Sequence, residues 1–209
     1  KNSRDFDLLT LGQLLLRLSP PDNERLSRGD TFVKQVGGAE LNVAVGAALL
    51  GLHTGVISKL PAHDIGSFMK GKIRSFGVSD DFFMYDQSSS ARVGIYYYEN
   101  GAYPRKPKVI YDRNNSSFFS LNIDEIPEEV YTASKCFHTT GITLALNEKI
   151  RETTIEMIKR FKAAGTLVSF DVNFRGNLWT GDEARECILR ILPYVDIFFC
   201  SEFVLFCCT

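Results

Sequence analysis

Histidine and cysteine are scarce in this chain of 209 residues, which has three histidines and five cysteines. His53, His63 and His138 lie far apart, whereas the ligands of a structural zinc site usually come in closely spaced pairs. The cysteines include no CxxC pair, and the adjacent Cys207 and Cys208 are poorly suited to a disulfide framework. The sequence therefore predicts no metal site, and it predicts that the cysteines are reduced thiols.

The chain also lacks an excess of charge of either sign. Its formal net charge is -1, and its isoelectric point is near 6.4. Nucleic acids and anionic lipids bind clusters of lysine and arginine, so neither is an expected partner of a chain with this balance.

Long apolar runs are absent as well. Val195–Cys200 is among the longest, and Asp196 interrupts it, far short of the roughly 20 residues that span a bilayer. The first residues, Lys1–Asp5, are polar, and no apolar segment typical of a secretory signal follows them. We therefore expect a cytoplasmic protein without a membrane anchor.

Two common nucleotide-binding signatures are missing too. The chain contains neither a GxGxxG fingerprint nor a GxxxxGK[ST] loop, so it matches neither Rossmann dinucleotide sites nor P-loop sites. What is present is the composition of an ordinary globular protein, 44% hydrophobic and 23% charged, with enough apolar mass for a sizeable core.

Short apolar runs alternate with amphipathic stretches along most of the chain, which predicts an α/β fold with a parallel sheet. The predicted strands are Phe6–Gly12, Thr54–Leu60, Lys135–His138, Thr166–Asp171 and Val195–Cys200. The first predicted helix begins at Gly37-Gly38 and ends at Gly51, and its inner face is formed by Leu41, Val45, Ala48, Leu49 and Leu52. Three more helices are predicted at Ile65–Phe76, Glu148–Ala164 and Asp182–Leu192. Gly165 is expected to end the third helix, and Thr180 and Glu183 to form a capping box for the last.

Four β-rich segments interrupt this alternation. Leu14–Leu18 and Thr31–Val36 flank a stretch rich in turn residues, and Ala91–Tyr98 is joined to Val109–Asp112 without an intervening helix. The last two segments predict an added antiparallel layer beside the central sheet.

Residues that could bind a ligand lie at the ends of several of these elements. Glycines at a helix start, Gly37-Gly38-Ala39-Glu40-Leu41-Asn42, can offer backbone amides and a side-chain amide to a polyol or an anion; a tight connection without a ligand fits them equally well. Asp171, Asn173 and Arg175 leave a predicted strand on one face if the extended backbone continues. The alternative is that Asp171 and Arg175 pair and only fix the loop.

Aromatic and basic residues add to this set in the interrupting segments. In the run Tyr96-Tyr97-Tyr98 alternate rings point to opposite faces, so one face can stack on a sugar while core packing explains the other. Tyr111 and Arg113 end the next segment with a hydroxyl and a guanidinium, and arginine favours bidentate contacts with carboxylate or phosphate.

Together these motifs resemble the ribokinase/PfkB family of carbohydrate kinases. Gly37-Gly38-Ala-x-x-Asn42, with Gly51 after the helix, is similar to the first signature of the family. Gly12-x-x-x-x-Arg17-Leu18-Ser19-Pro20 and Asp171-x-Asn173-x-Arg175-x-x-Leu178-Trp179 are most similar to 2-keto-3-deoxygluconate kinases within it. The resemblance covers nearly the whole chain.

The resemblance implies a Rossmann-like, ribokinase-like central sheet flanked by helices, with a small β lid that covers the sugar and commonly forms a homodimer. The lid would be inserted at about residues 14–36 and 91–112 of a domain spanning 1–209. ATP and Mg2+ would be the cofactors of the intact protein. Substrate-binding residues carried over by motif are Gly37, Gly38, Asn42, Tyr96, Tyr111, Arg113, Asn173 and Arg175.

The sequence departs from the family pattern in three places. Gln13 stands where acidic residues are frequent, and Ser201-Glu202-Phe203-Val204 replaces an Asn-x-x-Glu element linked to magnesium and phosphate. No Gly-Ala-Gly-Asp turn is present, although its amides hold the transferred phosphate and its aspartate is the general base in the family. We therefore expect the C-terminal part to be missing, the base to lie beyond Thr209, and no catalytic or metal-binding residue in this chain.

The expected function is ATP-dependent phosphorylation of a sugar or sugar acid by the intact protein, with 2-keto-3-deoxygluconate as the favoured substrate. This chain carries mainly the sugar-binding part. Arg113 and Arg175 favour an acidic sugar, because a neutral one leaves buried guanidinium groups poorly satisfied. Two alternatives remain open: a fructokinase or ribokinase that acts on a neutral sugar, and a sugar-binding module without catalysis.

Overall fold

The computed structural model describes residues 4–201. Its central sheet contains β1 (Phe6–Leu11), β4 (Thr54–Pro61), β5 (Val78–Ser79), β6 (Phe83–Asp86), β9 (Ser134–Thr140), β10 (Leu167–Asp171) and β11 (Ile197–Phe199). The order is β11-β10-β9-β1-β4-β5, with β6 also paired to β4, and all these pairs are parallel. The predicted parallel α/β sheet is confirmed.

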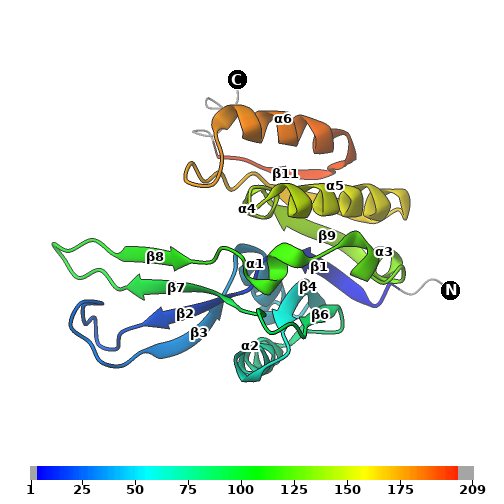
Figure 1. Ribbon diagram of the computed structural model, residues 1–209. Helices are drawn as coiled ribbons and strands as arrows, with labels where there is room; N and C mark the ends of the chain where they lie inside the picture. Colours follow the sequence, from blue (N-terminus) through cyan, green and yellow to red (C-terminus); the bar gives the residue numbers. More distant parts are fainter. Residues whose placement is uncertain (1–3, 202–209) are drawn as a thin grey trace.

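Helices cover both faces of this sheet (Figure 1). The main ones are α1 (Ala39–Leu49), α2 (Asp64–Ser75), α5 (Glu148–Ala163) and α6 (Gly181–Ile191), and the short ones are α3 (Val130–Ala133) and α4 (Gly141–Leu144). Single 3-10 turns lie at Ser117–Ser120, Ile123–Glu125 and Leu192–Tyr194. Helices α5 and α6 share one hydrophobic cluster with β1, β9 and β10, whereas α1 and α2 share a second cluster with β4.

The two long helices of the first cluster begin and end as their sequences predict. Thr180 Oγ1 accepts a hydrogen bond from the Glu183 amide at 3.2 Å, and Glu183 Oε2 accepts one from the Thr180 amide at 2.7 Å. These two bonds complete the capping box of α6. Gly165 follows α5 with a φ of 74°, a conformation that glycine adopts without strain. Both predicted caps are confirmed.

Stacked aromatic rings form the centre of the first cluster. Phe161 of α5 stacks on Phe137 of β9 with ring centroids 4.1 Å apart, and Tyr131 meets Phe161 edge to face at 5.1 Å. Trp179 closes this cluster near the carboxyl ends of the strands, where it is 4% exposed and packs close to Gly141. The core therefore reaches up to the edge where the loops begin.

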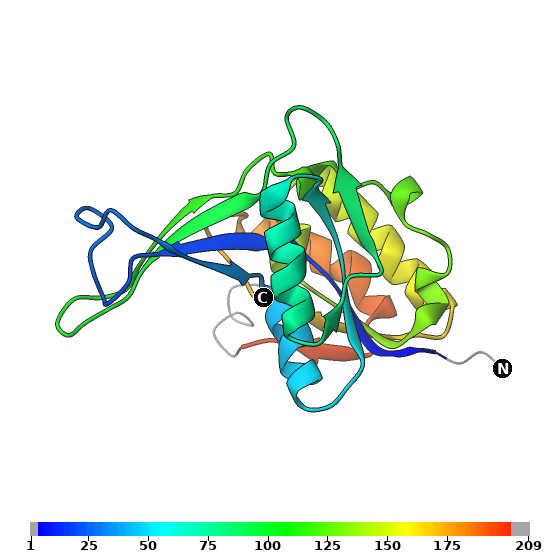
Figure 2. The same cartoon turned by 90° about the horizontal axis from the view of Figure 1, so that it is seen from below.

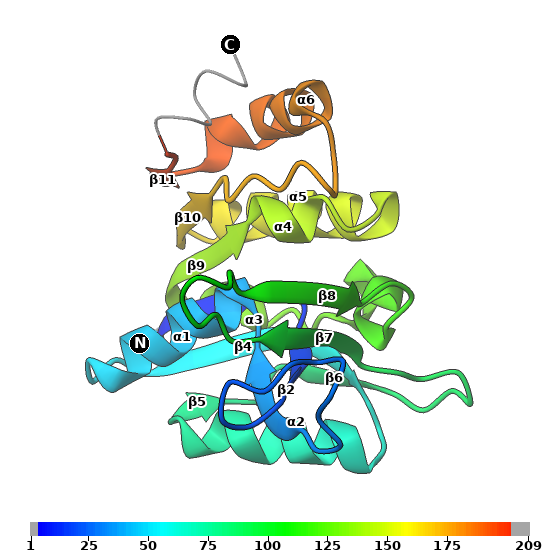
Figure 3. The same cartoon turned by 90° about the vertical axis from the view of Figure 1, so that its left-hand side faces the viewer.

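A second sheet, called the lid below, consists of β2 (Leu15–Ser19), β3 (Val33–Gly37), β7 (Gly94–Glu99) and β8 (Lys108–Asp112) in the order β3-β2-β7-β8. It extends well away from the body of the molecule in Figure 2. Figure 3, with the lid toward the viewer, shows α5 and α6 above its strands and α2 below them. The pair β7/β8 is antiparallel as predicted, β2/β3 is antiparallel too, and β2 pairs with β7 in parallel.

The inner face of α1 differs from the prediction. Leu41 and Ala44 are buried, whereas Leu49 is 77% and Leu52 46% exposed. The helix ends at Leu49, so its last turn and the following residues extend past the sheet instead of packing on it. The sequence pattern also missed the short strands β5 and β6, which add to the edge beside β4.

The structure also bears on the predictions of reduced cysteines and of no membrane span. Cys136 and Cys187 are free thiols, and burial raises the pKa of both. In residues 4–201 no helix has the length and apolar character needed to cross a bilayer. Cys207, Cys208 and the replaced element from Glu202 onward lie outside the described residues.

Candidate functional site

A cavity of about 650 Å³ opens between the lid and the carboxyl edge of the central sheet. The strand order changes direction at this edge, because β1 lies between β4, the next strand of this sheet along the chain, and β9, which comes later. Ligands of open α/β sheets bind at such a topological switch point. The cavity is lined by Gln13, Leu15, Arg17, Gly38, Ala39, Glu40, Asn42, Tyr96, Tyr98, Val109, Tyr111, Asp112, Arg113, Asn114, Ile142, Arg175, Asn177 and Leu178.

The N-terminus of α1 forms one wall of the cavity. Gly38 is the N-cap residue, and a Cβ there would lie 2.9 Å from the backbone oxygen of Gln13, so the approach of these two segments requires glycine. Gly37 is buried, and a Cβ there would meet the Tyr96 hydroxyl at 2.6 Å. Asn42, one turn into the helix, is exposed to the cavity.

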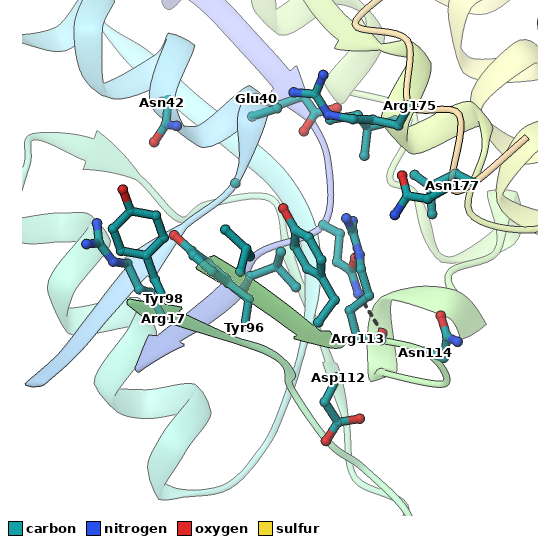
Figure 4. A pocket seen from close by; sticks show the side chains of 18 residues that line it. Arg17, Glu40, Asn42, Tyr96, Tyr98, Asp112, Arg113, Asn114, Arg175 and Asn177 are labelled. Carbon is teal, nitrogen blue, oxygen red and sulfur yellow. Dashed lines mark hydrogen bonds between the residues drawn. The ribbon is translucent and has the colours of Figure 1, made fainter. Parts of the chain in front are cut away.

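The lid provides an aromatic and basic wall on the other side. Tyr96 and Tyr98 of β7 point toward the cavity with Arg17 of β2, and they face Glu40 and Asn42 across it (Figure 4). The Arg17 guanidinium lies over the Tyr98 ring, 4.3 Å from its centroid. Burial raises the pKa of Tyr96, so its hydroxyl remains protonated at neutral pH. It can therefore donate a hydrogen bond.

Arg113, the first residue after β8, is fixed by the side chain of Gln13. Its Nε and Nη2 donate to Gln13 Oε1 at 2.8 and 2.5 Å, and Gln13 Nε2 donates in return to the Arg113 carbonyl at 3.1 Å. Gln13 Nε2 also donates to Ser116 Oγ at 2.7 Å. Burial lowers the pKa of Arg113, but a guanidinium stays charged in proteins. The site thus holds a fixed cation.

Glu40, in the first turn of α1, is a buried acid beside the cavity. Its Oε1 accepts hydrogen bonds from Thr140 Oγ1 at 2.6 Å and from Thr143 Oγ1 at 2.7 Å. Burial raises the pKa of this carboxyl, and the two hydroxyl groups oppose that rise. Gly12 passes so close that a Cβ there would overlap the carboxyl. Glu40 therefore ties α1 to the end of β9.

The loop after β10 brings Arg175 to the cavity but does not continue as an extended strand. The Asn173 amide donates to Asp171 Oδ1 at 3.0 Å, and Asn173 has a φ of 36°, so the backbone turns immediately after the strand. Because of this turn, Asn173 is not among the lining residues, whereas Arg175 and Asn177 are. Arg175 does not pair with Asp171; its Nη1 donates to the neighbouring Phe174 carbonyl at 3.2 Å.

Positive charge dominates the cavity. Arg17, Arg113 and Arg175 line it, and within residues 4–201 none of the three forms an ion pair with a carboxylate. Asp112 also lines the cavity, but it pairs with Arg92 at 2.9 Å. A ligand that carries a carboxylate or a phosphate would find guanidinium partners not already neutralised.

A second cavity, of about 310 Å³, lies on the face of the central sheet near α1 and is lined by Leu8, Val43, His138, Ser169, Asp171 and Phe199. His138 is buried, and its Nδ1 lies 2.9 Å from Ser169 Oγ. Burial lowers the pKa of His138, which keeps the ring neutral at physiological pH. His138 is therefore a core histidine.

The structure brings most of the predicted residues to one place. Gly38, Asn42, Tyr96, Tyr111, Arg113 and Arg175 all line the large cavity, whereas Gly37 and Asn173 do not. Residues that the sequence did not single out for this site are Arg17, Glu40, Tyr98 and Asn177. Arg17 and Tyr98 could have been found from strand alternation, since Arg17 pairs with Tyr96 in the lid, two residues from Tyr98.

Comparisons with known proteins agree with this architecture. The model of the pfkB family carbohydrate kinases matches residues 5–205. The chain is 37% identical over 196 residues to 2-dehydro-3-deoxygalactonokinase from Haloferax volcanii, and the match covers 94% of this chain and 61% of that protein.

Solved structures share the fold. The crystal structure of 2-dehydro-3-deoxygluconokinase from Thermotoga maritima superposes with a TM-score of 0.90 at 34% identity, covering 96% of this chain and 61% of that chain. An uncharacterized sugar kinase from Pyrococcus horikoshii, solved in complex with ATP, superposes with a TM-score of 0.79 at 26% identity, covering 91% and 62%. The chain thus spans about three fifths of the length of these relatives. With the family match extending over residues 5–205, the chain belongs to the PfkB family of carbohydrate kinases.

Proposed function

We propose that the protein to which this chain belongs phosphorylates an acidic sugar with ATP, and that the sugar is 2-keto-3-deoxygluconate or a close relative. The observation that carries this proposal is the group of three arginines around the large cavity, none of which is ion-paired within residues 4–201. A sugar carboxylate would supply the missing partner through charge-assisted hydrogen bonds.

The residues of this chain would divide the recognition of such a sugar. Arg113 and Arg175 bind the carboxylate from the lid end and from the loop after β10. Asn42 and the amides at the start of α1 bind hydroxyl groups, because the first turn of a helix has unpaired donors. Tyr96 and Tyr111, whose ring centroids are 5.9 Å apart, cover an apolar face of the sugar and exclude water.

Two relatives support the substrate class. The proteins from Haloferax volcanii and Thermotoga maritima are named for 2-dehydro-3-deoxygalactonate and 2-dehydro-3-deoxygluconate, sugar acids that differ in one hydroxyl configuration. The second is another name for 2-keto-3-deoxygluconate. Of the two, we propose the gluconate form for this protein.

The nucleotide and the metal are a separate matter. We propose ATP and Mg2+ as cofactors of the intact protein. In residues 4–201 no three His, Cys, Asp or Glu side chains are grouped so that they could hold a metal ion. We expect the 209-residue chain, which has no Gly-Ala-Gly-Asp turn, to bind the sugar without releasing ADP in a coupled assay.

We also propose that the protein is cytoplasmic and that the lid forms a homodimer. Phe32, Val33 and Ile110 leave apolar surface exposed on a four-stranded sheet that has little core of its own. Light scattering at micromolar concentration should give the mass of a dimer. A monomer whose stability does not change on dilution contradicts this part of the proposal.

The proposed substrate is tested with two ligands that differ only in the group at C1, which is charged in one and neutral in the other. Calorimetry compares binding of 2-keto-3-deoxygluconate with binding of 3-deoxyfructose, which has a hydroxymethyl group in place of the carboxylate. We expect the acid to bind more tightly. We expect Arg175→Lys to weaken binding of the acid by about 1–3 kcal/mol, since lysine keeps the charge but loses the planar fork.

The neutral ligand is the control for this experiment. Arg175→Lys should change the affinity for 3-deoxyfructose by less than about twofold, because no carboxylate is there to be lost. Equal losses for both ligands, or a wild-type preference for 3-deoxyfructose, would instead indicate a kinase for neutral sugars.

A further inference from the structure

Two helices that reach the large cavity are joined by the buried carboxyl of Glu40. This residue lies in the first turn of α1, and its Oε1 accepts hydrogen bonds from Thr140 Oγ1 at 2.6 Å and from Thr143 Oγ1 at 2.7 Å. Thr140 is the N-cap residue of α4, and Thr143 lies within that helix. Each of these three residues is 2% exposed or less, so water does not replace the hydrogen bonds. One carboxyl oxygen therefore fixes the start of α1 relative to α4.

Helix α4 in turn packs on the loop that carries Arg175. A Cβ on Gly141 would lie 2.1 Å from the Val172 backbone oxygen and 3.3 Å from the Trp179 indole, so the backbone of α4 contacts both ends of this loop. Val172 and Trp179 are buried, whereas Arg175 between them is exposed to the cavity (Figure 4). Its Nη1 donates only to the neighbouring Phe174 carbonyl, at 3.2 Å. The position of Arg175 therefore depends on how α4 holds the two ends of the loop.

The two threonines contribute differently to this connection. Thr140 Oγ1 also accepts a hydrogen bond from the Ile142 amide at 3.2 Å, so it caps α4 as well as bonding Glu40. In the part of the chain that the structure describes, the Thr143 hydroxyl has one hydrogen bond, the one to Glu40. Oε1 accepts it whether or not Oε2 carries a proton. Removal of the Thr143 hydroxyl therefore breaks one link between α1 and α4 and leaves the cap intact.

We infer that Glu40 is a positioning residue for substrate binding: through Thr143 and α4 it holds the loop after β10, so that Arg175 meets the sugar carboxylate while the start of α1 meets the sugar hydroxyls. The inference rests on the proposed function, because both contacts are made with the proposed acidic sugar. It adds a physical link between the two ends of the bound sugar.

Thr143→Val tests this link, because valine is similar to threonine in shape and has no hydroxyl. We expect the 209-residue chain with this change to bind 2-keto-3-deoxygluconate about fivefold more weakly in calorimetry. Thr154→Val is the matched control. Thr154, on α5, is 1% exposed, and within residues 4–201 its hydroxyl has no hydrogen-bond partner, so the affinity should stay within about twofold of the wild type.

A double-mutant cycle with Arg175→Lys distinguishes positioning from a general loss of stability. In the wild type, we expect Arg175→Lys to weaken binding of the acid about tenfold. In the Thr143→Val background the same change should weaken it less than about threefold, because Arg175 has already lost its fixed position. Two changes that act independently multiply their effects. An equal effect of Arg175→Lys in both backgrounds therefore overturns the inference.

Glu40 itself is tested by two replacements of similar length. Glu40→Gln keeps an oxygen that accepts both hydroxyl groups, and it should retain the affinity for the acid to within about threefold. Glu40→Met removes the acceptor and should weaken binding by about tenfold or more, since it leaves two buried hydroxyl groups without a partner. Equal losses in the two variants contradict the role of the acceptor oxygen.

Hydrogen exchange follows the loop without any sugar. The Leu178 amide donates to the Arg175 carbonyl at 2.9 Å, inside the loop after β10. In Thr143→Val we expect this amide to exchange about tenfold faster than in the wild type, while the amides of α2, in the other hydrophobic cluster, keep their rates. Thr154→Val should leave the Leu178 rate unchanged.

The binding and exchange measurements separate the two proposals. Tight binding of the acid, combined with an unchanged Leu178 rate in Thr143→Val, overturns the inference and leaves the proposed function standing. If the wild type binds neither 2-keto-3-deoxygluconate nor 3-deoxyfructose, the proposed function fails for this chain. The Leu178 rate then still decides whether Glu40 holds the loop.

Discussion

An inner strand of the central sheet and the outer strand of the lid bury their residues in opposite ways. All eight residues of β4, inside the central sheet, are buried. All five residues of β8, at the edge of the lid, are exposed. Apolar burial contributes about 25 cal/mol per Å², so β4 contributes far more hydrophobic stabilisation than β8.

This difference shows what holds each part in place. The central sheet is fixed by packing between aromatic and aliphatic side chains, which tolerates few changes. The outer lid is fixed by strand pairing and by polar contacts at its base, such as the Gln13 amide and the ion pair between Arg92 and Asp112, whereas at its inner end Leu16 of β2 joins the hydrophobic cluster of α1 and α2. Substitutions should therefore affect stability in the sheet and ligand binding in the lid.

The largest expected effect on stability comes from the stacked rings of the core. Phe161→Ala should lower the free energy of unfolding by about 3–5 kcal/mol, because it leaves a cavity beside Phe137 and Tyr131. Urea denaturation measures the loss. Leu189→Ala, on an exposed position of α6, is the control and should change it by about 0.5 kcal/mol or less. Similar losses in both variants would show that this cluster does not dominate stability.

A smaller effect, which depends on pH, is expected at the junction of sheet and lid. Burial raises the pKa of Glu40 in the folded state above its ordinary value, so the folded protein holds this proton more tightly than the unfolded chain. The stability that protonated Glu40 contributes is complete below the unfolded pKa and is lost as the pH rises through the folded pKa. Glu40→Gln cannot ionise and should not show this loss.

Urea denaturation at several pH values measures the difference between wild type and Glu40→Gln. The free energy of unfolding of the variant should increase relative to that of the wild type as the pH rises from about 4.5. Glu186→Gln, changed in the same way on an exposed position of α6, is the matched control. A difference that stays constant across this range would mean that Glu40 keeps its ordinary pKa in the folded protein.

The smallest effect is expected in the lid. Ile110→Ser, on the exposed strand β8, should change the free energy of unfolding of the dilute monomer by about 0.5 kcal/mol or less, because the side chain loses little buried area there. Denaturation at two protein concentrations tests this. The loss should be larger at the higher concentration, where a second copy covers this face in the proposed homodimer, and a loss that is the same at both concentrations would contradict dimerisation through β8.

The regular elements of the central sheet were predictable because their signals are local. The apolar run Thr54–Leu60 became β4, and the cap formed by Thr180 and Glu183 became the start of α6. The exposure of Leu49 was not predictable, because helical periodicity does not show how far the sheet extends beneath a helix. The strands β5 and β6 are too short to carry a pattern of their own.

The residues of the site also differ in whether the sequence predicted them. Glycines and basic residues at the ends of elements indicated Gly38, Arg113 and Arg175, since such positions meet at one edge of a parallel sheet. Glu40 gave no comparable signal: an acidic residue in the first turn of a helix is common, and its burial depends on Thr140, a hundred residues away in the sequence. Asn173 does not line the cavity with Arg175, because the backbone turns after Asp171 and does not stay extended.

Trp179 gives the protein a built-in optical reporter. It is the single tryptophan of the sequence, and it is buried four residues after Arg175 at the end of the same loop. Light absorbed near 295 nm therefore excites one indole at one known position, with emission that depends on the polarity and packing around it. A change in its fluorescence on adding a ligand would come from this loop, and no label would have to be attached to follow it.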